Sequence, residues 1–486
     1  MRRDTTRRRF LATSAAAATG VALGDLDALA QRPGGPNLIL VIVDSLRADA
    51  VYDRHIHTPN IDRLLASGLR FTSAYPEAMP TVPARNSILG GRRTFPFRNW
   101  HDYPGLLNSP GWSPLRDVNE SLPAVLRRAG YWTAYVTDNP FLGFSRPYAP
   151  LRASVNSFVR TGGQIGGSHP VSSVPDKVLR HWLHPSISPD KRKRVGLYLA
   201  NSRYWNNERR SFAAKVMKDA VRALEHGSRR RPFALIVDTY EPHEPWTPPP
   251  PYVDMYGKWG DREPAMPRYG KVDNWLRPGQ RGPVVRRLRE LYAAEVTMTD
   301  RWLGVLMNRV HDLGLESQTV IALVADHGIL LGEHGWTGKI STALHPALTN
   351  VPMVIVDPAH RRAGQFSRYF ASTHDIAPTL LSMMGVEAPK RMNGVDLSVK
   401  FEGRQPPKRD YAFGGYGNSF YIRTRRWALW GRNKPARLHL FDKRHDPSEG
   451  RNVARRHPQV VNRLYRIVRR RAGGRLPYYS GLDPDG

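Results

Sequence analysis

Cysteine is absent from this chain of 486 residues. Disulfide bonds and metal sites built on thiolates are therefore excluded. Acidic residues are also scarce, because 42 Asp and Glu stand against 73 Lys and Arg and leave a formal net charge of +31. This excess fits either a general bias toward arginine or attraction to polyanions, such as phosphorylated polymers of the cell envelope and anionic lipid headgroups.

The sequence also lacks recognisable nucleic-acid-binding motifs and internal repeats, and its basic residues are dispersed rather than arranged in stripes. We therefore expect no specific nucleic-acid partner. Hydrophobic residues still make up 40% of the chain, which is enough for a buried core and argues against wholesale disorder. Nothing in the sequence indicates an oligomeric state.

The first 30 residues have the pattern of a twin-arginine export signal. Residues 6–11 read TRRRFL, an alanine-rich run follows as far as Leu23, and residues 28–30 form a small-x-small cleavage sequence. The apolar run is too short and too weakly hydrophobic for a stable membrane span. We predict that residues 1–30 are a signal peptide and that the protein is exported to the periplasm, cell envelope or medium. A disordered basic leader is the alternative.

Apolar runs and amphipathic segments alternate along the rest of the chain. They predict buried strands at 37–43, 131–136, 233–238, 319–324 and 351–356, and helices at 58–68, after 83, and at 122–129, 288–310 and 376–384. This alternation predicts a large α/β catalytic domain over 36–400, followed by a small α+β subdomain over 405–486. Residues 145–200 are rich in Pro, Gly and Ser, and we expect them to form an insertion or lid.

Three of the predicted strands end in an acid, namely Asp44, Asp238 and Asp326, and the last is followed directly by His327. The carboxyl ends of strands are where an open α/β sheet presents its ligands. Carboxylate and imidazole donors gathered there can hold a divalent cation. Asp44 together with the Asp-His-Gly sequence favours a metal site over the alternative of helix-capping or turn residues.

Residues 80–91 read PTVPARNSILGG and predict a helix that opens close to Thr81. Backbone N–H groups at the start of a helix can hold an anionic phosphoryl oxygen. A hydroxyl bound to a divalent cation also loses its proton more easily.

Several blocks of this sequence resemble those of the sulfatase family, which belongs to the alkaline phosphatase superfamily. They are TPNIDRLLASGLRFTSAY, the segment 80–91, VADHGILLGEHGWTGK, NVPMVIV and DIAPTLLSMMGVEAPKRMNGVDL, in the family's order. LHLFDKRHDPSEGRNVARRHPQVVNRL is similar to the family's C-terminal closing segment. The resemblance covers nearly all of the mature chain. It implies an alkaline-phosphatase-like sandwich, with a large mixed, mostly parallel sheet flanked by helices.

The resemblance also implies roles for individual residues. Asp44, Asp326 and His327 correspond to metal ligands, and Thr81 corresponds to the nucleophile that also touches the metal. Asp238 and His243 could supply part of a second metal site, but a third ligand for it is not evident, so we expect one divalent ion, either Mn, Ca, Mg or Zn.

Four further residues correspond to groups that handle the substrate in the family. Arg85 resembles the arginine that fixes the nucleophile, and Lys339 resembles the lysine that meets the ester oxygens. His243 resembles the histidine that protonates or binds the leaving group. His345 is a weaker candidate for the same pocket, and the alternative for it is a helix-capping histidine at the surface. Two other histidines are expected to be structural, His334 and His374.

Three departures from the family pattern argue against an ordinary sulfatase. Sulfatases oxidise a Cys or Ser to formylglycine, whereas Thr81 stands here, so no formylglycine is expected. The family's second Asp is replaced by Ser45. Where sulfatases carry Gly-Lys-Trp-His, residues 137–140 read TDNP, so the Lys and His that grip sulfate are missing.

The leading hypothesis is therefore an exported, metal-dependent hydrolase that cleaves phosphate mono- or diesters, or sulfate esters, through a threonine nucleophile. Its substrate would be a small molecule or a polymer. One alternative is a sulfuric ester hydrolase proper, and another is a phosphotransferase in which an acceptor alcohol resolves a phospho-threonine. The last is a non-catalytic protein that binds an anionic polymer of the cell envelope through its positive charge.

Overall fold

The structure is a computed structural model that describes residues 35–164, 169–187, 189–203, 207–434 and 437–482. The predicted signal peptide at 1–30 lies outside these residues. Within the described ranges, no helix combines the length and the apolar character that a membrane crossing requires.

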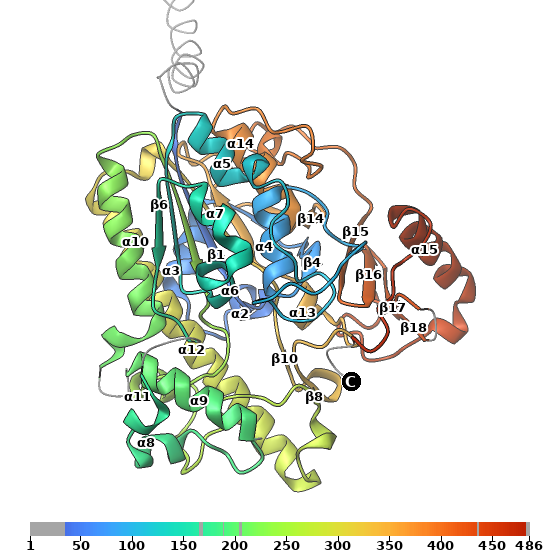
Figure 1. Ribbon diagram of the computed structural model, residues 1–486. Helices are drawn as coiled ribbons and strands as arrows, with labels where there is room; N and C mark the ends of the chain where they lie inside the picture. The colour runs from blue at the N-terminus through green and yellow to red at the C-terminus, as the bar shows by residue number, and fades with distance from the viewer. Residues whose placement is uncertain (1–34, 165–168, 188, 204–206, 435–436, 483–486) are drawn as a thin grey trace, which may run out of the picture.

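A sheet forms the centre of the large domain (Figure 1). It has eight strands in the order β13-β2-β12-β9-β1-β7-β5-β6. Its strands are β1 (Asn37–Val43), β2 (Leu69–Phe71), β5 (Trp132–Thr137), β6 (Ser157–Arg160), β7 (Phe233–Thr239), β9 (Thr319–Ala325), β12 (Met353–Val356) and β13 (Phe366–Ser367). Only β12 runs against its neighbours, since it pairs antiparallel with both β9 and β2. The predicted large, mixed and mostly parallel sheet is thus confirmed.

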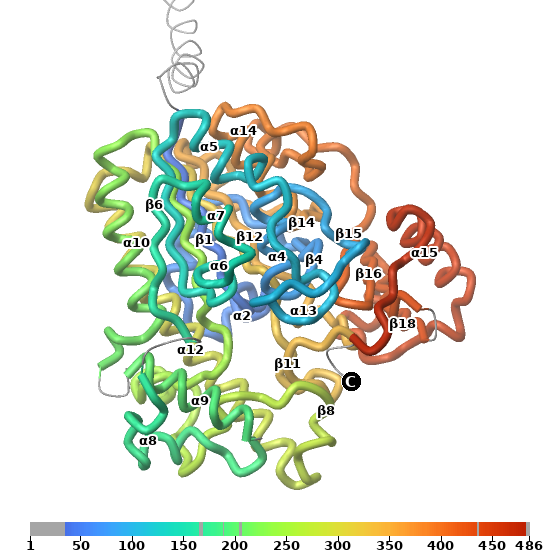
Figure 2. Tube along the Cα trace, in the orientation of Figure 1, coloured from blue at the N-terminus to red at the C-terminus, as the bar shows by residue number. Residues whose placement is uncertain are grey.

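Helices cover both faces of this sheet (Figures 1 and 2). On one face α10 (Phe212–Ser228) packs against β5 and β7, and α12 (Pro278–Asp312) packs against α10 and α3 (Pro59–Ser67). On the other face α4 (Thr81–Gly90), α5 (Leu122–Arg128) and α14 (Ile376–Met383) pack together. Every residue of β1, β7 and β9 is buried, because both faces of these strands are covered.

One helix differs from its prediction. Helix α12 begins at Pro278, ten positions before the predicted 288, because its first ten residues bury only Val284 and so leave little apolar periodicity in the sequence.

The described part of 145–200, the predicted insertion or lid, consists largely of regular elements. It contains α7 (Ala149–Ala153), α8 (Asp176–His181) and α9 (Pro189–Ser202), and its β6 pairs with β5 at the edge of the central sheet.

The C-terminal part forms a second sheet in the order β18-β17-β16-β15-β4. Strands β15 (Tyr411–Tyr416), β16 (Ser419–Thr424), β17 (Trp427–Arg432) and β18 (Leu438–Asp442) form an antiparallel meander, and α15 (Pro458–Arg471) packs against β16 and β17. The fifth strand, β4 (Ala78–Met79), comes from the large domain and ends just before α4. The C-terminal sheet therefore supports the start of α4.

Shorter elements complete the described chain. The remaining strands are β3 (Ala74–Tyr75), β8 (Gly270–Lys271), β10 (Leu330–Leu331), β11 (Trp336–Gly338) and β14 (Ala371–Ser372). The remaining α-helices are α2 (Ala48–Tyr52), α6 (Pro140–Phe144), α11 (Pro250–Val253) and α13 (Pro346–Thr349).

Candidate active site

The three acids predicted at strand ends lie side by side. Strands β9, β1 and β7 are adjacent and parallel, so their carboxyl ends meet at one edge of the sheet. The N–H of Asp44 donates to the carbonyl of Thr239 (3.1 Å), and that of Asp326 donates to the carbonyl of Val43 (3.3 Å). Asp238 lies within the last two residues of β7, and all three carboxylates are fully buried.

Asp44, Asp326 and His327 have the geometry of a metal site. One ligand atom from each lies within 4.8 Å of the other two. The Nδ1–H of His327 donates to the carbonyl of Gly328 (2.8 Å), which leaves the lone pair of Nε2 facing the acids. Neither Nε2 of His327 nor Oδ2 of Asp44 has a hydrogen-bond partner in the described chain, although both are buried.

The electrostatics of these three groups also fit a cation. Burial lowers the pKa of His327 to about 4, so its imidazole is neutral near pH 7. Burial raises the pKa of both carboxyls, and for Asp44 the neighbouring Asp326 adds to the rise. Two buried carboxylates and one neutral imidazole are a suitable donor set for Mn, Ca, Mg or Zn. A cation there would reduce the repulsion between the carboxylates and give a partner to the two atoms that lack a hydrogen bond.

Arg85 connects the acids to the first turn of α4. Its Nε and Nη2 donate to Asp238, with Nη2 2.7 Å from Oδ1. Its Nη1 lies 2.5 Å from Oδ2 of Asp326 and 3.1 Å from Oδ2 of Asp44. The same Nη1 donates to the carbonyl of Thr81 (3.2 Å). The guanidinium is completely buried, so these carboxylates are its charge partners.

Thr81 is the first residue of α4 and follows β4 and Pro80. It is 2% exposed. Support from the C-terminal sheet through β4, together with the hydrogen bond from Arg85, places the start of α4 against the acid cluster.

Ser45, which replaces the family's second aspartate, donates hydrogen bonds to both neighbouring acids. Its hydroxyl donates to Oδ1 of Asp44 (2.7 Å), and its N–H donates to Oδ1 of Asp326 (2.9 Å). Its φ of +58° is a conformation that side-chain-bearing residues rarely adopt. Ser45 therefore orients both carboxylates and leaves their Oδ2 atoms toward Arg85.

Asp238 has both oxygens engaged. Besides its bonds from Arg85, its Oδ2 accepts from the hydroxyl of Tyr135 (2.9 Å). The sequence left room for Asp238 and His243 as part of a second metal cluster. The observed contacts make Asp238 an ion-pair partner of Arg85 instead.

Lys339 and His243 form a second group with Glu244. The ammonium of Lys339 donates to Nε2 of His243 (3.0 Å) and to both carboxylate oxygens of Glu244 (2.9 Å each). The Nδ1–H of His243 donates to the carbonyl of Glu244 (2.6 Å), and the hydroxyl of Tyr240 lies 3.0 Å from Nε2. The hydroxyl of Tyr269 donates to Glu244. Lys339 thus directs its ammonium protons to three acceptors.

The charge of this second group rests on Lys339 and Glu244. Burial, with a contribution from Lys339, lowers the pKa of His243 to about 4, so this histidine is neutral near pH 7. Although burial favours the neutral acid, His243 and Lys339 hold the pKa of Glu244 well below its usual range. The field of Asp44 also acts on His243, so the two groups influence each other electrostatically.

His345 is not brought into contact with these residues. Its ring stacks on His334, with 3.9 Å between centroids, and lies edge-on to Trp430 in the C-terminal sheet. Burial lowers the pKa of His345 to about 3. Its observed neighbours give the predicted substrate contact no support.

Several site residues were not predicted from the sequence. Glu244 contacts Lys339 across 95 positions, and Tyr135 contacts Asp238 across 103. Contacts of this range leave no local pattern of spacing or periodicity. Adjacency to His243 was the one available signal for Glu244.

Two buried acids, Glu241 two positions before His243 and Glu295 on α12, interact with each other. Oε1 of Glu241 accepts from the hydroxyl of Tyr198 (2.6 Å) and from the amide of Gln164 (3.3 Å). Burial and the neighbouring Glu295 raise the pKa of Glu241, and burial raises the pKa of Glu295. At least one of the two carboxyls is therefore protonated near neutral pH.

Glu295→Gln is expected to remove a loss of stability that the wild type suffers as pH rises from about 4.5 to about 8. A carboxyl whose pKa is raised by folding stays protonated in the native state while the unfolded chain ionises above about pH 4.5. Native stability therefore falls as pH rises above that value. In urea unfolding, the variant should gain stability over the wild type between pH 5 and pH 8. The exposed control Glu387→Gln should show no such trend, and an equal gain at both pH values would contradict the protonated pair.

Two models of protein families match this chain. A family model described as Sulfatase matches residues 36–386. A second, described as N-sulphoglucosamine sulphohydrolase, C-terminal, matches residues 332–471. Together the two matches extend over the α/β domain and most of the C-terminal sheet and helix.

Individual relatives act on more than one ester class. An arylsulfatase of Clostridium perfringens is 24% identical over 476 residues, covering 92% of this chain and 96% of its own. The multifunctional alkaline phosphatase superfamily protein PehA of Trinickia caryophylli is 26% identical over 411 residues, covering 74% and 76%. Phosphonate monoester hydrolase SpPMH from Silicibacter pomeroyi has a similar structure, with a TM-score of 0.68 at 21% identity, covering 92% and 97%. The structural likeness shows a shared fold.

Proposed function

Because the chain belongs to the sulfatase family, we propose that it is a metal-dependent hydrolase of phosphate, phosphonate or sulfate esters, with Thr81 as its nucleophile. The observation that carries this proposal is the buried cluster of Asp44, Asp326 and His327, with Arg85 joining it to Thr81. Shifted pKa values and buried ligand atoms without a hydrogen bond are typical of a catalytic centre.

In the proposed reaction the Thr81 oxygen attacks the phosphorus or sulfur of the ester. A bond from Thr81 to the central atom forms, and the bond to the leaving oxygen breaks. Water then cleaves the Thr81 ester and releases the acid. A divalent cation held by Asp44, Asp326 and His327 would lower the pKa of the Thr81 hydroxyl and stabilise negative charge on the ester. The positive end of the α4 dipole adds to that stabilisation.

Lys339 and His243 would act on the other side of the ester. The Lys339 ammonium already donates to Nε2 of His243, so a substrate oxygen that displaces His243 can accept that proton. Glu244 holds the ammonium in place through two hydrogen bonds. The pair thereby keeps a proton next to the leaving group although His243 itself is neutral.

Phosphorus esters are favoured over sulfate esters as substrates. Thr81 cannot become the formylglycine of an ordinary sulfatase, and TDNP at 137–140 lacks the lysine and histidine that sulfatases use there. The likeness to a phosphonate monoester hydrolase agrees with this preference. The test of this preference compares turnover of four aryl esters. They are the 4-nitrophenyl monoesters of phosphate, phenylphosphonate and sulfate, and a bis-aryl phosphate. Faster release from sulfate than from every phosphorus ester would instead support the sulfatase alternative.

Export and the choice of acceptor are two further proposals. We propose export through the twin-arginine signal at 1–30, which deletion of those residues and fractionation of the cell would test. An acceptor alcohol in place of water would make the enzyme a phosphotransferase. Adding an alcohol to the assay and measuring its phosphoryl ester separates this alternative from hydrolysis.

Divalent cations are expected to stabilise the protein through the predicted metal site. A ligand that binds only the native state at 100 times its Kd adds about 2.7 kcal/mol to stability. Mn, Zn, Ca and Mg, each added to protein treated with a chelator, should therefore raise Tm to different extents. The rise should disappear in His327→Ala and persist in the control His311→Ala, whose side chain is exposed. An unchanged rise in His327→Ala would exclude this residue as a ligand.

His243→Gln is expected to lower kcat for esters with a poor leaving group, because His243 positions the Lys339 proton that the leaving oxygen accepts. The loss should reach about 10²- to 10⁴-fold, which is the usual contribution of positioned proton transfer. Esters of 4-nitrophenol should be affected less, because that leaving group departs without protonation. The ratio of kcat for phenyl and 4-nitrophenyl esters measures the difference. An equal loss for both would show that His243 binds substrate without assisting the leaving group.

A further inference from the structure

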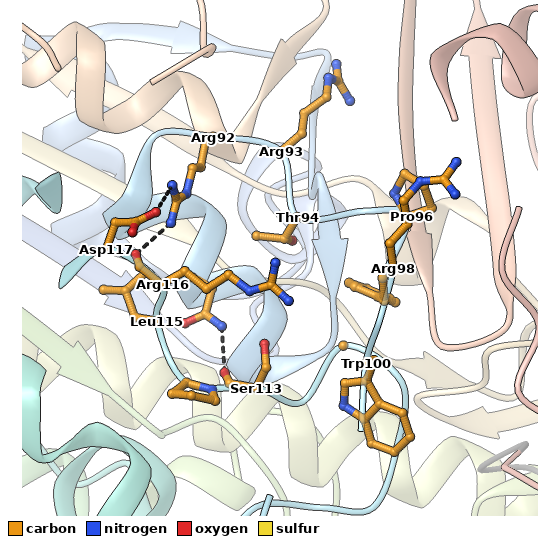
Figure 3. Close-up of a pocket in the computed structure, with 14 residues that line it drawn as sticks. Arg92, Arg93, Thr94, Pro96, Arg98, Trp100, Ser113, Leu115, Arg116 and Asp117 are labelled. Carbon is orange, nitrogen blue, oxygen red and sulfur yellow. Dashed lines mark hydrogen bonds and ion pairs between the residues drawn. The ribbon is translucent and has the colours of Figure 1, made fainter. Parts of the chain in front are cut away.

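A basic pocket lies beside the second half of α4. Figure 3 shows the residues that line it. Its volume is about 360 Å³, and it is formed by the end of α4 and the loop from Arg92 to Asp117. Because a helix rises about 1.5 Å per residue, the lining begins about 7.5 Å along α4 from Thr81, at Asn86, and extends past the end of the helix to Arg92. Neither the metal group nor the lysine group contributes a residue to this lining.

The charge of this pocket is strongly unbalanced. Its lining includes four arginines and one acid, Asp117. Arg92 pairs with Asp117 at 2.6 Å, and Arg391 lies 3.2 Å from the same carboxylate. One carboxylate is thus shared by two guanidinium groups.

The other three arginines of the pocket differ in how far they are neutralised. Arg93 donates to the carbonyl of Phe413 (3.1 Å) and forms a long ion pair with Glu77 (3.9 Å), so its charge is partly neutralised. Arg98 donates to the carbonyl of Arg475 (2.7 Å). The exposed Arg116 extends into the pocket, and its guanidinium makes no hydrogen bond or ion pair with any described residue (Figure 3). Backbone carbonyls orient a guanidinium but leave its charge available to a ligand.

The basic surface continues from the pocket onto the C-terminal helix. Arg98 reaches the chain directly after α15, and Arg471 near the end of α15 is close enough to affect the pKa of Arg93. Residues 451–482 contain nine arginines and neither Asp nor Glu. A ligand that carries repeated negative charges would meet favourable potential along this whole path.

We propose that the arginine pocket, formed by Arg92, Arg93, Arg98 and Arg116, binds an anionic group of a polyanionic ester substrate. The group would be a sulfate, phosphate or carboxylate carried by a unit other than the one cleaved. The pocket's volume suits one monomer unit with its charged substituent. Planar guanidinium groups bind such oxyanions with paired hydrogen bonds. The inference rests on the proposed function for its substrate but not for the binding itself.

Binding is tested first, without turnover. A sulfated oligosaccharide and a short polyphosphate are titrated into the full-length protein by calorimetry at fixed salt. Arg116→Ala should weaken Kd about tenfold, in line with a charged hydrogen bond, and Arg116→Glu should weaken it further. Arg116 has no side-chain partner to lose, so both variants should fold normally. The matched control is Arg229→Glu, which reverses the charge of an exposed arginine at the end of α10.

Several results would overturn the proposal. One is equal affinity of Arg116→Glu and wild type for both probes, and another is an equal loss in Arg229→Glu, which would indicate diffuse attraction to net charge. Preference for one probe over the other identifies the oxyanion.

A second arm measures kinetics. KM for a polyanionic ester should rise in Arg116→Ala, whereas kcat/KM for a 4-nitrophenyl ester should stay unchanged. Loss of turnover on the small ester would show that Arg116 belongs to the catalytic centre and would contradict a separate pocket. If no ester is turned over, the proposed function fails, but the titrations still show whether the pocket binds an anionic group.

Discussion

Thr81→Ala is expected to reduce kcat by at least about 10³-fold, because the variant lacks the oxygen that attacks the ester. Removing one nucleophile usually costs nearly as much as removing the whole catalytic group, since the other residues act through it. The measurement is single-turnover hydrolysis of the best substrate in the panel. Residual activity should come from binding and charge stabilisation alone.

Thr81→Ser provides the matched control for this result. It keeps the hydroxyl at the first position of α4 and should retain a substantial part of the activity. Intact mass after rapid quenching should show a covalent adduct on wild type and on Thr81→Ser but none on Thr81→Ala. Normal turnover by a folded Thr81→Ala would assign the attack to water and exclude the threonine ester.

The strand ends of this fold could be predicted from the sequence for a local physical reason. Strands β1, β7 and β9 are covered on both faces, so each is a continuous apolar run that is visible without any alignment. Parallel neighbours must end at the same edge. The placement of Asp44 and Asp326 at one edge of the sheet therefore followed from the pattern of strands, whereas the structure shows that β1 and β9 are neighbours.

Ion pairs between residues far apart in the chain could not be predicted from local sequence patterns. Arg85 reaches Asp238 across 153 positions and Asp326 across 241, and neither contact has any periodicity in the sequence. The reversal of β12 was also hidden, because its four buried residues are the same whichever way the strand runs. His345 was assigned to the substrate pocket by resemblance, but it packs on aromatic residues of the C-terminal sheet. These features depend on tertiary packing.

Arg85→Met is expected to lower the free energy of unfolding by about 3–5 kcal/mol in the presence of a chelator. Removing one partner of a buried ion pair leaves an uncompensated buried charge, and this is the usual cost. Here three fully buried carboxylates, of Asp44, Asp238 and Asp326, lose the guanidinium together. Arg85→Lys should recover only part of the loss, since an ammonium cannot reproduce the planar fork that bonds Asp238 and Asp326 at once. Urea unfolding at pH 7 measures both variants.

The same experiment separates the role of Arg85 from that of the cation. A divalent ion at Asp44 and Asp326 would supply positive charge to two of the three carboxylates, so adding Mn should reduce the deficit of Arg85→Met without removing it. Asp238 would stay unpaired, and Arg85→Met/Asp238→Asn should be more stable than Arg85→Met for that reason. If Arg85→Met is as stable as wild type under chelation, the carboxylates are protonated when the arginine is lost. Burial and mutual repulsion, which already raise the pKa of Asp44, would then outweigh their affinity for charge.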